Sequence, residues 1–439
     1  MTAVITGIGI VAPNGIGTDE YWAAVLAGTS GIAPITRFDA SRYPVRLAGE
    51  VTGADPAAQI PARLMVQTDR WTHLGLHAAE LALADAGADP AVLPEYEMAV
   101  VTASSSGGTE FGQREIEKLW QHGPGHVGAY QSIAWFYAAT TGQISIRHQM
   151  RGPCGVIATE QAGGLDAIGQ ARRLLRGDAR LVVTGGTDAS LCPYGLVAQL
   201  STGLLSRGTD PARAYLPFDV SASGYLPGEG GAILIAEDAG QAAARSGRSG
   251  RPPYGEVAGY ASGFDPPPGS GRPAALTRVI RAALADSGLA AEDIAVVFAD
   301  AAGVPELDAA EADAIGSVFG AGRVPVTAPK TLTGRLYAGG AALDVATALL
   351  SLRHGVIPAT AGVSTLAGGC RQIDLVRGQP RPLTAGAGRP AAALVLARGF
   401  SGFCAALVLC APPRHGTPTA QRSPRVIRRR ECASSVATT

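Results

Sequence analysis

The sequence is poor in charged and aromatic side chains. Only 16% of its 439 residues are charged and 5% are aromatic, against 46% that are hydrophobic. Such a composition is typical of a chain that buries a large core, and the length suggests two domains or one large duplicated domain. No apolar run is long enough to cross a membrane, and no basic segment followed by an apolar stretch opens the chain. We therefore expect a cytoplasmic protein without a membrane partner.

Metal-binding patterns are also missing. The six cysteines (154, 192, 370, 404, 410 and 432) form no CxxC pair and show no metal-ligand spacing, so we expect buried free thiols. His73 and His77 lie four residues apart on an expected helix, but no glutamate follows His73 as in the zinc motif HExxH. The sequence predicts neither a metal site nor a cofactor.

The net charge is zero, but the charge is unevenly spread. The segment 412–439 holds six arginines and one acidic residue, which leaves 30 basic and 35 acidic residues in the rest of the chain. A body with a net charge near −5 does not predict a nucleic-acid partner. The basic tail has almost no hydrophobic pattern, so we expect it to be disordered and solvated rather than bound to an acidic partner.

Glycine is abundant, with 58 residues, and buried strands alternate with helices. This alternation predicts an α/β protein with halves at 1–240 and 254–411. Gly7 and Gly9 are followed by no third glycine at the spacing of a dinucleotide-binding loop. The hydrophobic pattern predicts helices at 18–28, 63–87, 109–120, 165–176, 275–285, 309–319 and 341–352. It predicts strands at 3–12, 98–103, 179–186, 232–236, 295–299 and 400–409.

Two segments of the chain resemble each other. Ala-Gly-Gly at 162–164 and again at 338–340 leads into a helix that ends with arginine, and a strand precedes each corner. We interpret this as a weak duplication of βα units, which would bring the strand ends of both halves to one site. In the first corner a nucleophile is the usual occupant, yet the residue there is Gln161, whose neutral amide cannot attack an acyl group.

Several ordered motifs over residues 1–411 resemble the β-ketoacyl synthases of the thiolase fold. They are the PFD…GEG signature at 217–230, a K-x-x-x-G-H-like run at 330–335 and a closing glycine-rich strand at 400–408. The resemblance implies a five-layered α-β-α-β-α core made of two duplicated βα halves. It also implies a catalytic Cys and two His, whose positions here hold Gln161, Asp300 and Arg335. Of the four catalytic positions of the family, only Lys330 is retained.

Loss of those groups beside intact glycines resembles one subfamily, the chain length factors or ketosynthase beta subunits of type II polyketide synthases. Its signature resembles the runs 159–164 and 191–195. The resemblance implies a heterodimer with a ketosynthase alpha subunit that carries the working Cys. It further implies an acyl carrier protein whose phosphopantetheine delivers malonyl units, and a tunnel at the subunit interface for the growing poly-β-ketone.

In this subfamily the helix after the Ser-Gly-Gly turn lines the end of the tunnel. The matching residues are Thr109, Gly112 and Ile116, whose spacing places them on one helical face. Two of them are small, so we expect a long product of around ten or more two-carbon units, because a wall resists extra methylenes only where it is packed. The alternative is that they are ordinary residues of an interface helix.

An aromatic segment at 130–137 contains Tyr130, Trp135 and Phe136. From the residues alone it is equally compatible with a core and with an interface. The resemblance favours the interface, because the matching loop of the family crosses to the partner subunit.

Gln161 has two interpretations. Its carboxamide could stabilise an enolate oxyanion while malonyl groups are decarboxylated to prime the synthase. We favour a structural role, in which Gln161 hydrogen-bonds its neighbours and an ion pair between Asp300 and Arg335 fills the old cavity. A competing function is a stand-alone thiolase-fold acyltransferase or malonyl decarboxylase, for which Thr159 and Glu160 are the candidate nucleophiles. A purely structural scaffold is a third alternative.

Overall fold

The computed structural model describes residues 2–249, 252–267, 269–384 and 390–412. The predicted basic tail at 412–439 lies outside these residues except for Pro412, and so does Cys432. None of the helices in the described ranges has both the length and the apolar character needed to cross a membrane.

The first half of the chain forms one end of a mixed sheet. Its strands lie in the order β6-β5-β7-β8-β1, where β6–β5 and β5–β7 are parallel and β7–β8 and β8–β1 are antiparallel. All of these strands except the edge strand β6 are almost entirely buried, which explains why they read as continuous apolar runs. Their bounds are β1 Ala3–Ala12, β5 Met98–Ala103, β6 Cys154–Ile157, β7 Leu181–Asp188 and β8 Gly230–Asp238.

The second half repeats this topology. Its strands follow the order β11-β10-β15-β16-β9, again with two parallel and then two antiparallel pairs, and β13 extends it beyond β11. β1 and β9 pair antiparallel and join the two halves. The matching strand orders confirm the predicted duplication. The bounds are β9 Gly255–Phe264, β10 Ile294–Phe298, β11 Pro325–Thr327, β13 Asp374–Leu375, β15 Ala392–Arg398 and β16 Phe403–Cys410.

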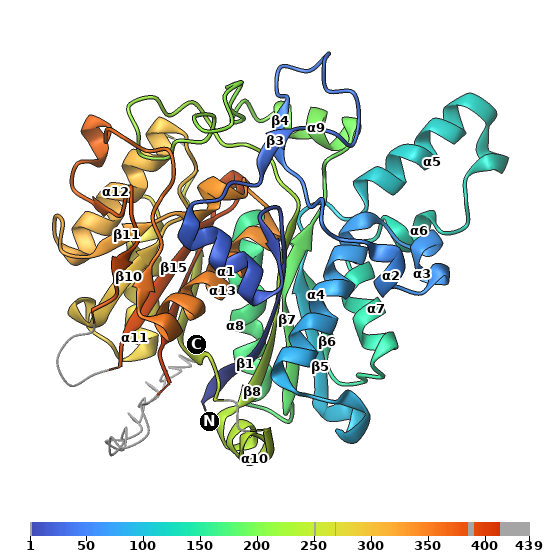
Figure 1. Ribbon diagram of the computed structural model, residues 1–439, viewed down its shortest axis with the longest axis horizontal. Helices are drawn as coiled ribbons and strands as arrows, with labels where there is room; N and C mark the ends of the chain where they lie inside the picture. The colour runs from blue at the N-terminus through green and yellow to red at the C-terminus, as the bar shows by residue number, and fades with distance from the viewer. Residues whose placement is uncertain (1, 250–251, 268, 385–389, 413–439) are drawn as a thin grey trace, which may run out of the picture.

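Two helices occupy the centre of the molecule. α8 (Gly163–Leu175) follows β6 and α13 (Ala338–His354) follows β11, so the two Ala-Gly-Gly corners occupy equivalent places. A Cβ on Gly164 would lie 2.6 Å from the carbonyl oxygen of Ala338, so glycine lets the two helices meet closely. α4 (Arg70–Ala86) covers the outer side of the first half, and α11 (Leu276–Ser287) and α12 (Pro305–Phe319) that of the second (Figure 1). Together these elements make the expected five layers.

Several predicted element bounds were wrong. The helix expected at 63–87 is divided into α3 (Ala62–Gln67) and α4, because Asp69 caps α4 by accepting the Trp71 N–H at 3.2 Å. α12 begins at Pro305 rather than at 309, since proline suits the first helical turn. The strand expected at 400–409 begins at Phe403, because the residues before it form a 3₁₀ turn with Ser401 at φ 66°. The hydrophobic pattern did not predict the strands β9 and β15.

Helix α5 (Thr109–His122) leaves the end of β5 and extends away from the layered body, with the short α6 (Gln131–Ala134) beside it (Figure 1). We call residues 109–137 the α5–α6 projection. The remaining helices are α1 Thr18–Ala27, α2 Pro56–Gln59, α7 Ala139–Arg147, α9 Pro193–Leu200 and α10 Ala239–Ser249. The remaining strands are short: β2 Gly15–Ile16, β3 Ile32–Pro34, β4 Leu47–Gly49, β12 Val356–Ile357 and β14 Arg381–Pro382.

Candidate functional site

The corner between β6 and α8 holds Gln161 in a one-turn 3₁₀ helix, Glu160–Ala162. Gln161 is fully buried, and its amide packs against Gly340, where a Cβ would lie 2.9 Å from Oε1. Neither Oε1 nor Nε2 has a hydrogen-bond partner within the described ranges, so the expectation that Gln161 bonds its neighbours was wrong. The reason is that the opposing helix α13 presents glycine backbone to this amide, and that backbone already makes the hydrogen bonds of its own helix.

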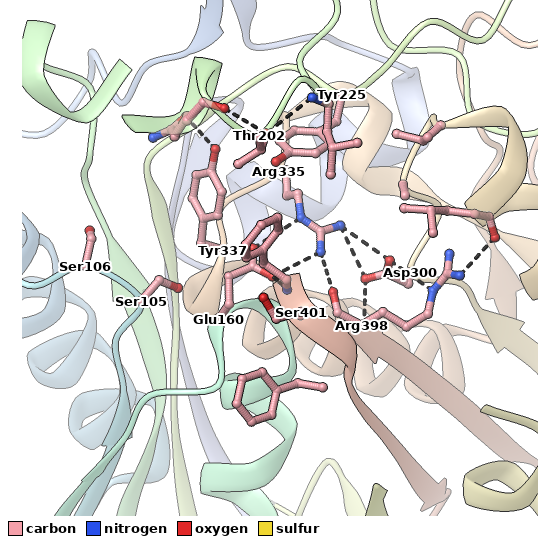
Figure 2. A pocket seen from close by; sticks show the side chains of 18 of the residues that line it. Ser105, Ser106, Glu160, Thr202, Tyr225, Asp300, Arg335, Tyr337, Arg398 and Ser401 are labelled. Atoms are coloured by element: carbon pink, nitrogen blue, oxygen red, sulfur yellow. Dashed lines mark hydrogen bonds and ion pairs between the residues drawn. The ribbon is translucent and has the colours of Figure 1, made fainter. Parts of the chain in front are cut away.

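The charged residues of the site form a chain of ion pairs (Figure 2). Arg335 Nη1 lies 3.4 Å from Asp300 Oδ1, which gives the expected ion pair. Arg335 Nε also lies 3.4 Å from Glu160 Oε1 on the corner. On the other side of Asp300, Arg398 Nε lies 3.5 Å from Oδ2, and Arg398 Nη2 lies 3.2 Å from Glu311 Oε2. Three acidic and two basic side chains are therefore paired in one line, in which Asp300, Arg335 and Glu311 are buried and the other two are half-buried.

Backbone groups hold this line in place. Glu311 accepts the N–H groups of Asp300 at 2.7 Å and Ala301 at 2.9 Å, while Asp300 Oδ1 accepts that of Arg398 at 3.0 Å. Glu160 Oε2 accepts the Phe400 N–H at 2.8 Å. Burial by itself raises the pKa of Asp300, but Arg335 and Arg398 overcome it and hold that pKa below its usual value. Asp300 is thus an anion whose charge is already compensated.

Lys330 does not join the ion-pair line. Its Nζ lies 2.7 Å from Asp344 Oδ2 on α13, and both side chains are buried. Burial raises the pKa of Asp344 to about 6 although Lys330 opposes the shift. The structure therefore brings Asp300 and Arg335 together but gives the retained lysine a separate partner.

A pocket of about 610 Å³ opens beside the ion pairs. Its wall includes Arg335, Asp300 and Glu160, but neither Gln161 nor Lys330 lines it. Hydroxyl groups and apolar side chains form most of the rest, among them Ser105, Ser106, Thr109, Thr202, Leu204, Tyr225, Leu307, Tyr337 and Phe400. The volume suits a small organic ligand, yet both arginines in the wall are already paired with carboxylates.

No group of metal-ligating side chains is present in the part of the chain that the structure describes. Cys192, Cys370 and Cys404 are buried free thiols as expected, and Cys410 is also buried. Cys154 is exposed, so the prediction was wrong for that residue, which begins the edge strand β6.

The residues expected to limit the tunnel lie along α5. Thr109 is buried and lines the pocket, whereas Ile116 is 43% exposed further along the helix. Gly112 is buried between them, and a Cβ there would meet Trp135 Cδ1 at 2.9 Å. The indole of Trp135 thus occupies the place that a side chain at position 112 would need, a contact that sequence spacing did not reveal.

The aromatic segment is largely exposed. Trp135 and Phe136 are 47% and 56% exposed, and Tyr130 also faces solvent. Other exposed apolar side chains of the α5–α6 projection are Ile116, Leu119, Trp120 and Ile133. An apolar surface of this size on a single chain is typical of a protein–protein interface.

Sequence reasoning missed Arg398 and Glu311 as members of the site and considered Glu160 only as a nucleophile. Glu160 carried a signal, because it adjoins the corner residue. Arg398 directly precedes the glycine-rich run at 399–402, but its ion pairs depend on how β15 lies beside β10. Nothing in the local pattern of α12 marked Glu311.

Comparison with known proteins agrees with this architecture. Models of the β-ketoacyl synthase N-terminal and C-terminal domains match residues 2–240 and 254–364. The ketoacyl synthase beta subunit of the tetracenomycin polyketide synthase from Streptomyces glaucescens is 60% identical and covers 94% of this chain and 98% of its own length. A putative β-ketoacyl synthase 2 of the actinorhodin polyketide from Streptomyces coelicolor is 58% identical, covering 93% of this chain and 98% of its own.

Among solved structures, the ishigamide ketosynthase/chain length factor superposes with a TM-score of 0.84 at 27% identity, covering 94% of this chain and 99% of that one. Fold and sequence agree. The chain belongs to the β-ketoacyl synthase family and, within it, to the ketosynthase beta subunits, or chain length factors, of type II polyketide synthases.

Proposed function

We propose that this protein sets the length of a poly-β-ketone through the α5–α6 projection and contributes no nucleophile of its own. The observation that carries the proposal is the state of the former catalytic site. Its corner residue is a buried neutral amide outside the pocket, and both arginines of the pocket are paired with carboxylates. Acyl transfer requires a nucleophile and an adjacent base, and neither group is available in that arrangement.

The same arrangement argues against decarboxylation of malonyl groups at this site. Loss of CO2 leaves an enolate oxyanion that needs hydrogen-bond donors, but the Gln161 amide does not line the pocket, and Arg335 and Arg398 are already paired with carboxylates. The candidate nucleophiles of a stand-alone acyltransferase are engaged as well. Thr159 donates its hydroxyl to Asp166 Oδ2 at 2.6 Å, and Glu160 accepts from Arg335 and Phe400. A structural role for Gln161 therefore remains the favoured one.

The partner that completes the enzyme is a ketosynthase alpha subunit with an intact cysteine. The exposed apolar side chains of the projection supply a surface for such a heterodimer. An acyl carrier protein with a phosphopantetheine arm would deliver malonyl units to the alpha subunit. In this arrangement α5 faces the growing chain at the subunit interface.

Chain length would then be set by volume along one face of α5. Thr109 is small and lines the pocket at the base of the helix, Gly112 packs without a side chain against Trp135, and Ile116 is the first bulky residue of that face. Forcing a further methylene into a filled wall costs about 1–3 kcal/mol, which is enough to stop elongation at a defined length. The small residues support a product of around ten or more two-carbon units.

The test is Gly112→Phe in a complex reconstituted with the alpha subunit and carrier protein. The added ring competes with Trp135 for the same space, so we expect products shorter by one or more two-carbon units, measured by mass spectrometry. Val92→Phe places the same ring on an exposed turn that precedes β5, while α5 follows that strand, and should change nothing. Unchanged product length in an intact Gly112→Phe heterodimer would disprove the gate.

The competing enzymatic function is tested separately. The purified chain is incubated alone with an acyl thioester and its mass is measured. We expect no covalent adduct, and an adduct on Thr159 or Glu160 would establish the acyltransferase instead. Gln161→Ala in the complex should leave priming intact if the glutamine is structural.

A further inference from the structure

Asp69 joins two helix beginnings that belong to different parts of the molecule. The residue lies between α3 and α4 and is completely buried. Its Oδ1 accepts the Trp71 N–H of α4 at 3.2 Å, and its Oδ2 accepts the Phe111 N–H of α5 at 2.7 Å. One carboxylate therefore serves the first turns of two helices that are about forty residues apart in sequence.

The two helices differ in how firmly they are held. α4 packs on the first half of the sheet, and its Trp71 is fully buried in the core. α5 instead leaves the body as part of the α5–α6 projection (Figure 1). Because both helix dipoles are positive at their N-termini, a single negative charge between them attracts both. Asp69 thus links the α5–α6 projection to a helix that packs on the sheet.

The turn before α5 is shaped around this contact. A Cβ on Gly108 would lie 2.9 Å from Asp69 Cβ and 2.1 Å from the Ala134 carbonyl oxygen. The Gly108 N–H donates to the Trp135 carbonyl at 3.3 Å, so α5 starts between Asp69 and the aromatic segment. Burial raises the pKa of Asp69 to about 6 although both backbone N–H groups lower it. The buried position is thus unfavourable for the carboxylate, which is consistent with a role in placing α5.

We propose that Asp69 is a positioning residue for chain-length control: it fixes the start of α5 and thereby the place of Thr109, Gly112 and Ile116 along the tunnel. This role depends on the proposed function, because α5 determines length only if it forms the gate. Asp69 itself touches no substrate. Its loss should broaden the range of products rather than shorten or lengthen them uniformly, since α5 would sample more than one position.

The experiment compares Asp69→Asn and Asp219→Asn in the full chain, reconstituted with the alpha subunit and carrier protein. Asparagine keeps one acceptor and removes the charge and the second acceptor. A bond to a charged group is worth about a factor of ten or more in equilibrium, so the ratio of the main product to its neighbours in length should fall by roughly tenfold. Asp219 is the matched control, because it is also buried and accepts the N–H groups of Ser364 and Thr365, both at 2.9 Å, away from α5.

Both variants should lower the melting temperature, but only Asp69→Asn should change the product ratio. Equal destabilisation with an unchanged ratio in both would overturn the positioning role. Should Asp69→Asn fail to fold, Phe111→Pro removes the donor from the α5 side at a position in the first turn where proline is tolerated, and the same broadening is expected. An unbroadened ratio for that variant counts equally against the proposal.

Gly112→Phe is run in parallel to separate two failures. If Gly112→Phe alters length and Asp69→Asn does not, the gate stands and the positioning role of Asp69 is refuted. If neither variant alters the products, the proposed function fails and the role of Asp69 fails with it.

Discussion

The pocket and the α5–α6 projection adjoin at Thr109 and are opposite in character. The pocket pairs Arg335 and Arg398 with carboxylates of the same chain. The projection carries few buried contacts and leaves Trp135 and Phe136 exposed. The arginines of the pocket have partners within the chain, whereas the aromatic side chains of the projection remain exposed. The charges of these arginines are thus compensated within the chain, while the projection leaves apolar surface uncovered.

The largest effect should come from breaking the filled pocket. Arg335→Ala leaves Glu160 without its arginine and Asp300 with Arg398 alone. Removing one partner of a buried pair exposes the uncompensated desolvation cost of the other, so we expect a loss of about 3–5 kcal/mol in the free energy of unfolding. Urea unfolding followed by circular dichroism measures it.

Arg151→Ala is the control for that variant. Arg151 Nη1 lies 3.2 Å from Glu95 Oε1 in a pair whose side chains are 58% and 39% exposed. An exposed pair contributes about 0–1 kcal/mol, because water and salt screen it. If Arg335→Ala lowers the free energy of unfolding no more than Arg151→Ala does, the buried ion pairs do not stabilise the pocket.

An intermediate effect should come from the projection. Trp135→Ala combined with Phe136→Ala removes two exposed aromatic side chains, and aromatic residues at an interface centre commonly contribute 2 kcal/mol or more. We expect the dissociation constant of the heterodimer with the alpha subunit to rise by about thirtyfold or more. Analytical ultracentrifugation or surface plasmon resonance measures the change.

Phe136→Ala alone helps to interpret the double variant. Trp135 also packs on Gly112 within the chain, whereas Phe136 is more exposed, so its loss should weaken binding with little change in melting temperature. Val92→Ala, at a side chain that is 77% exposed before β5, should leave affinity unchanged. Full affinity in the double variant would place the interface elsewhere.

Sequence patterns could predict the layers but not every contact between them. The two Ala-Gly-Gly corners predict equivalent helices, and α8 and α13 are equivalent in the topology. The pairing of Asp300 with Arg335 could be anticipated because both replace groups of one known site. Glu311 and Arg398 could not, since their contact depends on how α12 and β15 come together in space. Local periodicity describes an element's own face and says nothing about its neighbour.

The same limit explains the failure at Gln161. A polar corner residue suggests hydrogen bonds with its neighbours, but the element that packs on it is α13, which lies far away in sequence and offers Gly340 at the point of contact. Likewise, the boundary between α3 and α4 at Asp69 could not be predicted, because apolar residues continue on either side of it. Its acceptor role involves Phe111, which no local pattern connects to residue 69.

The smallest effect, taken per pH unit, should appear at Asp188, which connects the two regions. Its carboxylate accepts the Ser105 N–H at 3.1 Å, in the loop that leads to α5, and the Ala338 N–H at 2.9 Å, at the start of α13. Burial raises the pKa of Asp188 to about 7, although both backbone bonds lower it. Between about pH 4 and 7 the folded chain therefore holds a proton that the unfolded chain has released, and the stability contributed by this group falls as pH rises through that window.

Asp188→Asn should remove this contribution, so the unfolding free energy of the variant should depend less steeply on pH between 4 and 7, by at most about 1.4 kcal/mol per pH unit. Urea unfolding at a series of pH values measures the slope, and Asp219→Asn serves as the control, because hydrogen bonds to Asp219 lower its pKa despite burial. If Asp188→Asn leaves the pH dependence of the unfolding free energy unchanged, the pKa of Asp188 is the same in the folded and the unfolded chain. The charge of Asp188 would then contribute nothing to the link between the pocket and the projection, and the two regions would be coupled only through packing.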